Sequence, residues 1–295
     1  MLRRNLVLFP YGIICDMSRF FTTSDPLDEI IAETFPDRQI ENTKHILTGW
    51  TNIVIEVTTD VGAYFFRFPR NPFWSKMIVK DAAVCNFVDG KTSFYTPQMK
   101  LCYDAKKRPF SVHKKIEGYT LGDRIYHLSH TALTGVAYDV AKFIKELSKI
   151  DLKDAPEEVK YPLSDFLREL DYKHYDNHID NDHKFIKETE MTNLVHGDLN
   201  LGNVLLDNND RVVGIIDFCF AGTGNPNMDV ARMLSRPVPE KFESEFLAQF
   251  VNEDGADENQ ARAEVDRMRR AWKNIDNGYA NHIRMYFPEI NLNQL

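Results

Sequence analysis

The stretch LVHGDLNLGNVLLDNNDRVVGIIDF, residues 194–218, decides the fold of this chain. Three short apolar runs within it predict strands: LVH (194–196), VLLD (204–207) and VVGIID (212–217). His196 ends the first run, and Asp198 and Asn203 follow before the second, in the spacing His-x-Asp-x-x-x-x-Asn. Asp217 follows Asn203 by fourteen residues, at the end of an apolar run. We expect the hairpin between Asn203 and Asp217 to bring their side chains together.

These polar residues fit the chemistry of phosphoryl transfer. One carboxylate orients a substrate hydroxyl and receives its proton, while an amide oxygen and a second carboxylate hold Mg²⁺ against nucleotide phosphates. Magnesium prefers such oxygen ligands and keeps several waters, so two protein ligands are enough. A lone His-Gly-Asp triplet is more often an ordinary turn, but the complete set at this spacing favours a kinase.

The motif HGDLNLGNVLL, followed by IIDF, resembles the signature of the kinase-like aminoglycoside phosphotransferase and choline kinase family. The resemblance extends from about residue 40 to residue 235. It implies that Asp198 is the catalytic base, that Asn203 and Asp217 bind Mg²⁺, and that His196 supports the loop without reacting. Asp229, in NPNMDVARM, matches a family acid that caps or anchors the next helix.

The same resemblance implies a nucleotide site in the first half of the chain. Residues 48–52 (TGWTN) resemble the turn that covers the nucleotide, where glycine allows close backbone approach to phosphate. The strand 110–116 and the turn at 117–118 resemble the hinge whose backbone binds adenine or guanine. The implied nucleotide-binding residues are Gly49, Thr51, Asn52, Arg67, Asp81, Lys114, Lys115 and Ile116.

Two of these residues depart from the family in type. Arg67 stands where the family often has a lysine that holds phosphates, and Asp81 stands where a helix glutamate usually pairs with it. The exchange is chemically consistent, because arginine offers a wider fork and aspartate is one methylene shorter. The competing interpretations are a solvated strand charge for Arg67 and an exposed helix acid for Asp81.

Within the family, FRFPR, KKIEGYTL, AKFIKELSKI and GIIDFCFAG are most similar to the aminoglycoside 2″-phosphotransferase branch, some members of which accept GTP. Ser148 and Cys219 depart from that branch, which commonly has a histidine and an acid or glycine there. Neither departure removes a catalytic group.

The order of predicted elements indicates an α+β, bilobal, protein-kinase-like fold. Strands are predicted at 51–57, 63–68 and 108–116, and helices at 25–35, 76–88, 132–150, 240–251 and 260–280. We expect a small antiparallel-sheet N-terminal lobe over residues 17–115 and a larger, mostly helical C-terminal lobe over 116–295. Residues 1–16 read as an N-terminal extension, because Met17 begins a more ordinary N-terminus.

The amino-acid composition limits the kinds of partner that this protein is expected to bind. With 44 acidic and 36 basic residues the formal charge is -8, which argues against a nucleic-acid partner. No apolar run is long enough for a membrane span, so we expect no membrane partner. The four cysteines form no Cys-x-x-Cys pair, which favours a reducing, cytoplasmic setting without zinc or disulfides.

We therefore expect a small-molecule kinase that uses Mg²⁺ and ATP or GTP, with an aminoglycoside as the first candidate substrate and antibiotic resistance as its role. In residues 151–190 acidic side chains outnumber basic ones by six, which attracts a cationic substrate or simply keeps the helices solvated. A choline, homoserine or sugar kinase would share every catalytic residue. A protein kinase fits less well because HGD replaces His-Arg-Asp, and a non-catalytic nucleotide-binding module is the alternative from another class.

Overall fold

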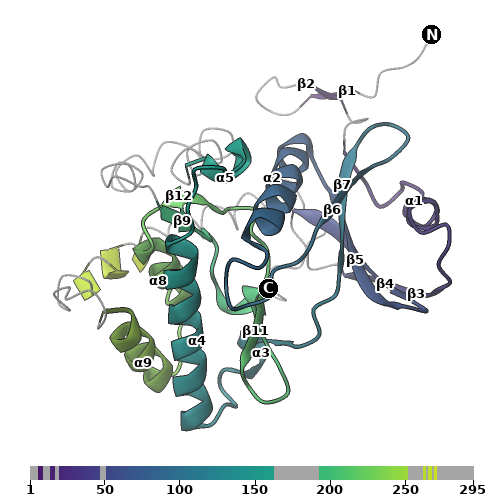
Figure 1. Ribbon diagram of the computed structural model, residues 1–295. Coiled ribbons are helices and arrows are strands. Elements are labelled where there is room, and N and C mark those ends of the chain that lie inside the picture. The colour runs from purple at the N-terminus through teal and green to yellow at the C-terminus, as the bar shows by residue number, and fades with distance from the viewer. Residues whose placement is uncertain are drawn as a thin grey trace. The chain divides into compact units, whose positions relative to one another are not determined.

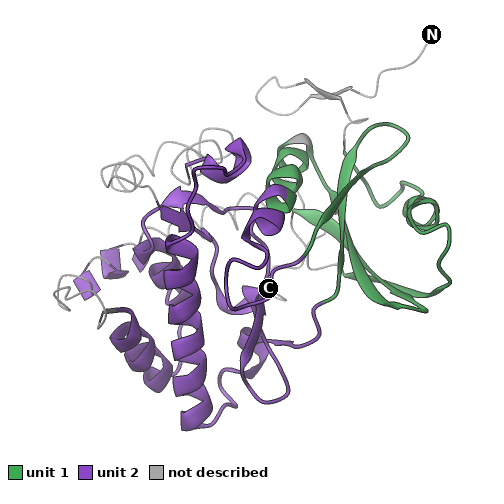
Figure 2. Ribbon diagram, in the orientation of Figure 1, with its two compact units in different colours: residues 1–82, 98–115, 289–295 green, residues 83–97, 116–288 purple. Residues whose placement is uncertain are grey.

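The computed structural model describes residues 6–8, 14–16, 20–46, 51–162, 193–251, 262–263, 265–267 and 269–270. These residues form two compact units, coloured separately in Figure 2. The first unit contains the described residues up to Ala82 together with Gln98–Lys115. The second contains Ala83–Pro97 and the described residues from Ile116 onward. An antiparallel sheet dominates the first unit and helices are prominent in the second, so the predicted α+β fold class is confirmed.

A five-stranded antiparallel sheet forms the first unit, in the order β3-β4-β5-β7-β6 (Figure 1). Its strands are β3 (Ile40–Ile46), β4 (Asn52–Thr59), β5 (Gly62–Pro69), β6 (Lys100–Tyr103) and β7 (Pro109–Lys114). The β4–β5 hairpin closes where Thr59 pairs with Gly62, between the strands predicted at 51–57 and 63–68. Register then places Phe66 opposite Ile55 and Val112, so the three central strands share one apolar face.

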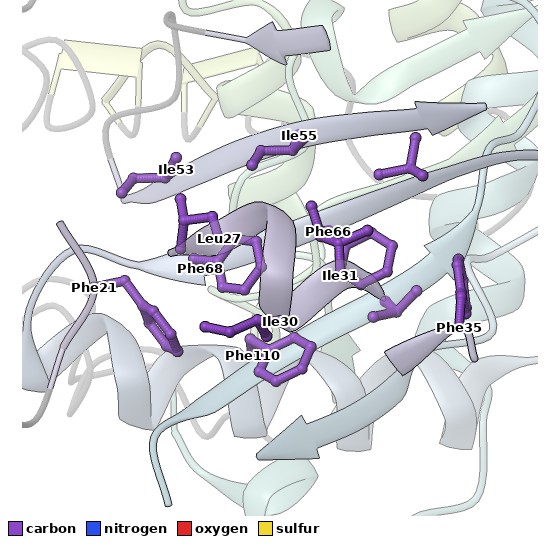
Figure 3. Close-up of a cluster of buried hydrophobic side chains, with 12 residues drawn as sticks. Phe21, Leu27, Ile30, Ile31, Phe35, Ile53, Ile55, Phe66, Phe68 and Phe110 are labelled. Carbon is purple, nitrogen blue, oxygen red and sulfur yellow. The ribbon is translucent and has the colours of Figure 1, made fainter. Parts of the chain in front are cut away.

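The core of the first unit lies between this sheet face and helix α1 (Leu27–Thr34). Alternate residues of β4, β5 and β7 point to the same face, as a strand period of two requires. The buried side chains, most of them labelled in Figure 3, are Phe21, Leu27, Ile30, Ile31, Phe35, Ile53, Ile55, Val57, Phe66, Phe68, Phe110 and Val112. Each fully buried side chain of this size contributes about 1.5–3 kcal/mol. The residues between these buried positions, which include Arg67, point to the opposite face of the sheet.

Helix α2 (Pro72–Val88) begins in the first unit and ends in the second. It starts four residues before the predicted helix. The Asn71 side chain accepts a hydrogen bond from the Trp74 backbone N–H at 2.9 Å, and proline follows Asn71 at the first helical position. This is a capped helix start that the apolar spacing alone did not reveal.

Helix α4 (His130–Ser148) is the longest helix of the second unit among the described residues, and α9 (Glu240–Val251) packs against it. Ser129 caps α4 by accepting a hydrogen bond from the Ala132 N–H at 3.2 Å. The apolar residues that recur at helical spacing are all buried: Leu133, Val136, Ala137, Val140, Ile144 and Leu147. The helix predicted at 132–150 is therefore confirmed, with one face in the core.

The remaining elements of the second unit are short. Two small antiparallel sheets have the orders β11-β10-β8 and β12-β9. Their strands are β8 (Tyr119–Thr120), β9 (Asn193–Val195), β10 (Val204–Leu206), β11 (Val212–Ile215) and β12 (Gly222–Gly224). The short helices are α3 (Leu121–Arg124), α5 (Glu157–Lys160), the 3₁₀ turn η2 (Leu201–Asn203) and α8 (Asn227–Met233).

Some predicted segments fall outside the described residues. Most of the acidic segment 151–190 lies there, as does much of the helix predicted at 260–280. Within residues 1–16 the strands β1 (Leu6–Leu8) and β2 (Ile14–Asp16) pair antiparallel. In the described part of the chain, no helix combines the length and the apolar character needed to cross a membrane.

Candidate active site

His196 follows β9 directly and is completely buried in the second unit. Its Nδ1 accepts a hydrogen bond from the Asp198 backbone N–H at 3.2 Å, so its proton lies on Nε2, which donates to the Ile216 carbonyl at 3.0 Å. Burial lowers the pKa of His196, and its ring packs against Phe218 with centroids 4.5 Å apart. A neutral imidazole with both nitrogens engaged supports the loop and does not act as a base.

Gly197 adopts a backbone conformation that a larger residue would strain. Its φ is 77°, and a Cβ added there would lie 2.5 Å from the carbonyl oxygen of Phe220. The loop that carries Asp198 and the segment after Asp217 therefore approach each other closely at this position. The glycine of the HGD motif is a packing requirement of the site.

The Asp229 carboxylate anchors this loop. It is completely buried and accepts hydrogen bonds from the backbone N–H groups of His196 and Gly197, both at 2.8 Å. Burial raises the pKa of Asp229 to about 7, although the two N–H donors act in the opposite direction. Asp229 was expected to cap or anchor the next helix; it lies in the first turn of α8, and its carboxylate ties this helix to the loop before Asp198.

Asp198 is held by one of its two carboxylate oxygens. Oδ1 accepts hydrogen bonds from Nε of Arg232 at 2.6 Å and from Nδ2 of Asn200 at 3.1 Å. Oδ2 receives a longer contact of 3.4 Å from Nδ2 of Asn203. The oxygen left with the weaker contact is the one suited to accept a proton from a hydroxyl.

Arg232 is a site residue that the sequence reasoning missed. It lies three residues after Asp229 in the motif NPNMDVARM, and residues three apart are neighbours on one face of a helix. Helix α8 therefore presents one residue to the loop backbone and another to the Asp198 side chain. The spacing itself was the available signal, but it required knowing that α8 packs against the loop.

Asn203 and Asp217 meet at one end of the β10–β11 pair. Val204 pairs with Ile215, and the Ile216 N–H continues the ladder by donating to the Asn203 carbonyl at 3.0 Å. Asp217, the next residue, has a φ of 66°, a left-handed conformation that aspartate tolerates and that is frequent at functional sites. The hairpin thus makes the backbones of Asn203 and Asp217 neighbours, and their joint binding of a metal stays a prediction.

The donor atoms of this pair fit Mg²⁺. The Asn203 Nδ2 donates to the Asp198 carbonyl at 2.9 Å, so the amide oxygen Oδ1 is the atom that Asn203 could offer to a metal, and Asp217 could offer a carboxylate. The described residues contain no group of three or more histidine, cysteine, aspartate or glutamate side chains that could hold a metal. A magnesium ion bound by Asn203 and Asp217 would take its other oxygens from phosphates and water.

In the first unit, Arg67 of β5 and Asp81 of α2 form an ion pair. The Asp81 side chain is completely buried and the Arg67 side chain is 11% exposed. The predicted contact is therefore present, although these positions usually hold lysine and glutamate in the family that the sequence resembles. It excludes a fully solvated charge for Arg67 and an exposed acid for Asp81.

The other predicted nucleotide-binding residues are placed as follows. Gly49 lies outside the described residues. Asn52 is buried, its Nδ2 donates to the Thr51 hydroxyl at 2.8 Å, and its Oδ1 has no hydrogen-bond partner in the described part of the chain. The Lys115 ammonium pairs with Glu56 at 2.8 Å, and the Lys115 backbone N–H donates to the Ala63 carbonyl at 2.9 Å. Lys114 ends β7, and Ile116 begins the next segment, in the second unit.

Comparison with known proteins places this site in a family. Residues 42–266 match the model of the phosphotransferase enzyme family. Among solved structures, the GDP complex of wild-type aminoglycoside 2'-phosphotransferase-IIIa has a TM-score of 0.67 and 21% identity, covering 85% of this chain and 89% of that one.

Two further structures show the same fold. The streptomycin–ATP complex of APH(2″)-IIa has a TM-score of 0.61 and 20% identity, with 83% of this chain and 87% of that one covered. The macrolide 2'-phosphotransferase MphH from Brachybacterium faecium has a TM-score of 0.62 and 12% identity, with 91% and 98% covered. Because the family model spans most of the sequence and includes all the motif residues described above, the chain belongs to the phosphotransferase enzyme family.

Proposed function

We propose that this protein transfers the γ-phosphoryl group of ATP or GTP to a hydroxyl of a small molecule, with Asp198 as the catalytic base. The observation that carries this proposal is that hydrogen bonds join Asn203 both to Asp198 and to the residue before Asp217. Asn203 holds the Asp198 carbonyl through its side chain at 2.9 Å and receives the Ile216 N–H on its own carbonyl at 3.0 Å. One loop and one hairpin thus carry the proposed base and the two proposed oxygen ligands.

This arrangement gives each residue a task in the transfer. Asp198 Oδ2 orients the acceptor hydroxyl and takes its proton as the oxygen attacks the γ-phosphorus. Asn203 and Asp217 would hold Mg²⁺, which when bound neutralises phosphate charge. Arg67, oriented by Asp81, would hold nucleotide phosphates, and the backbone at 114–116 would bind the base. Thr51 and Asn52 would contribute to the turn over the nucleotide.

An aminoglycoside is the first candidate acceptor. The support is the streptomycin complex of a relative with the same fold, together with the excess of acidic residues in 151–190, which attracts cations. Antibiotic resistance in the cytoplasm would be the corresponding role. Choline, homoserine and sugars remain alternatives because they need the same catalytic groups, and the likeness to MphH adds macrolides to the compounds worth testing.

An acceptor screen tests the proposal. The purified full-length protein is incubated with Mg²⁺ and ATP or GTP in the presence of aminoglycosides, macrolides, choline, homoserine or sugars. Acceptor-dependent release of nucleoside diphosphate and a phosphorylated product found by mass spectrometry would support it, with Asp198→Asn as the inactive control. Nucleotide binding without turnover in any mixture would favour the non-catalytic module instead.

A further inference from the structure

We infer that Arg232 is a positioning residue that holds Oδ1 of Asp198 so that Oδ2 faces the acceptor hydroxyl. The inference rests on the proposed phosphotransfer function and names a residue that the motif pattern did not include. Arg232 exchanges no proton itself, because its guanidinium stays charged at every relevant pH.

The contact between the two side chains is short and sheltered. Arg232 Nε lies 2.6 Å from Oδ1 of Asp198, and the two side chains are 10% and 16% exposed. A charge-assisted hydrogen bond of this kind is about twice as strong as one between neutral groups. Its low exposure reduces the screening that weakens surface ion pairs.

The two carboxylate oxygens of Asp198 are consequently not equivalent. Oδ1 has two good donors, Arg232 Nε and Asn200 Nδ2 at 3.1 Å. Oδ2 has only the 3.4 Å contact from Asn203 Nδ2 among the hydrogen bonds of the described residues. Rotation of the carboxylate would break the two better bonds, so the carboxylate has one preferred orientation.

Helix α8 holds Arg232 in a fixed position. Asp229, one turn earlier in the same helix, holds the backbone N–H groups of His196 and Gly197 at 2.8 Å. The same helix therefore fixes the backbone leading into Asp198 and the side chain of Asp198. Loop and carboxylate are positioned as one unit, which is what a reaction sensitive to small displacements requires.

This orientation of Asp198 serves the transfer of the γ-phosphoryl group. The acceptor oxygen forms a bond to the γ-phosphorus, and the bond from that phosphorus to the β–γ bridging oxygen breaks. The electron pair leaves with the nucleoside diphosphate, and the hydroxyl proton passes to Oδ2 of Asp198. The charge of Arg232 is unchanged throughout, so its effect is on geometry.

The test compares Arg232→Gln and Arg232→Lys with the wild-type protein in the presence of Mg²⁺, at nucleotide concentrations that are varied up to saturation. We expect Arg232→Gln to lower kcat by about 10²-fold, the cost typical of a catalytic group displaced by roughly 1 Å, with the nucleotide KM changed less than about twofold. Arg232→Lys should recover part of kcat, because it keeps the charge without the planar fork. A residue that only tied α8 to the loop would not separate kcat from KM in this way.

Arg211→Gln is the matched control. Arg211 also pairs with an aspartate of the second unit, Asp139, through contacts of 2.9 and 2.6 Å, but neither residue touches Asp198 in the described contacts. Its loss should lower the melting temperature and leave kcat near that of the wild type. The Asp198→Asn background is the second control, since adding Arg232→Gln there should cost no further activity.

The outcomes separate this inference from the proposed function. A wild-type kcat in Arg232→Gln, or a loss that persists undiminished in the Asp198→Asn background, would overturn the positioning role alone. A kcat loss in Arg232→Gln that merely follows the fraction of folded protein would overturn it too. Wild-type protein that neither transfers phosphate nor hydrolyses nucleotide would remove the proposed function and this inference with it.

Discussion

Arg67 and Asp81 form an ion pair in which the carboxylate is completely buried and the guanidinium nearly so. Arg67 occupies the sheet face opposite the phenylalanine core, since Phe66 and Phe68 on either side of it are fully buried. Removing one partner of a buried pair costs about 3–5 kcal/mol, because the remaining charge stays in a poorly solvated place. The pair therefore fixes the position of the guanidinium relative to α2 within the first unit.

Substitution of this pair should affect nucleotide use. We expect Arg67→Ala to raise the apparent nucleotide constant and lower turnover, and Asp81→Ala to do the same more mildly. Once Arg67 is gone, deleting Asp81 should add little, with a non-additivity of about 0.5–3 kcal/mol. Lysine at position 67 should restore part of the activity, since it supplies the positive charge without the two-pronged hydrogen bonding of a guanidinium.

A double-mutant cycle in steady-state kinetics checks this prediction, with melting temperatures recorded for each variant to separate stability from function. Strictly additive losses would show that the two residues act apart. Lys76 or Arg70 would then be better candidates for holding phosphate.

Asp198→Asn should abolish most phosphotransfer while leaving folding and nucleotide affinity largely intact. The proton acceptor acts on the substrate hydroxyl, and general-base assistance is typically worth about 10²–10⁴ in rate. Turnover measured with the best acceptor, alongside nucleotide affinity by calorimetry, provides the check. A turnover within about threefold of wild type is incompatible with the role of base.

Asp217→Ala should weaken metal-dependent nucleotide binding more than Asn203→Ala. The first change removes a full negative charge as well as an oxygen ligand, and the second removes a neutral ligand. Magnesium titrations of nucleotide binding with each variant establish the order. Wild-type binding by both variants would contradict the metal assignment.

Gly197→Ala should destabilise the loop before Asp198. Its new Cβ would lie 2.5 Å from the Phe220 carbonyl oxygen, in addition to the strain of a φ of 77°. Gly90→Ala is the matched control, because Gly90 has a φ of 70° and no atom within 4 Å of an added Cβ. We expect a lower melting temperature for both variants, with the larger drop and the loss of activity in Gly197→Ala. Equal drops would show that the contact with Phe220 relaxes freely.

The sequence predicted secondary structure best in elements that bury one face against a core. The apolar spacing of α4 and the β4–β5 hairpin predicted real elements, because their buried residues repeat with the helix or strand period. Strands β3 and β6 were missed because they are the two edges of the sheet. Five consecutive residues of β3 are exposed, so no alternation marks it as a strand.

The residues of the candidate site also differ in how far the sequence alone indicates them. Asp198, Asn203 and Asp217 could be proposed as a set because their spacing along one loop and one hairpin is fixed by local structure. Arg232 and the loop-anchoring role of Asp229 depend on α8 packing against that loop, which is a tertiary contact. Position along the chain does not encode such a contact.

Asp229 should make stability depend on pH in an unusual direction. Its pKa is raised from 3.8 to about 7 in the folded protein, mainly by burial, so between these values the folded state holds a proton that the unfolded chain has lost. Its contribution to stability therefore falls by about 1.4 kcal/mol per pH unit from pH 4 to pH 7 and levels off above. Buried His196 acts oppositely, because its lowered pKa costs stability as pH falls below about 6.5.

Asp229→Asn separates these two effects, because asparagine does not titrate while His196 remains. Urea unfolding of both proteins at several pH values between 5 and 8 should give a free-energy difference, wild type minus variant, that decreases as pH rises and becomes constant above about pH 7. The variant should also lose turnover, since its single amide oxygen accepts readily from only one of the two N–H groups of His196 and Gly197. A pH-independent difference would mean that Asp229 is already ionised throughout this range, held by its two backbone donors against the cost of burial.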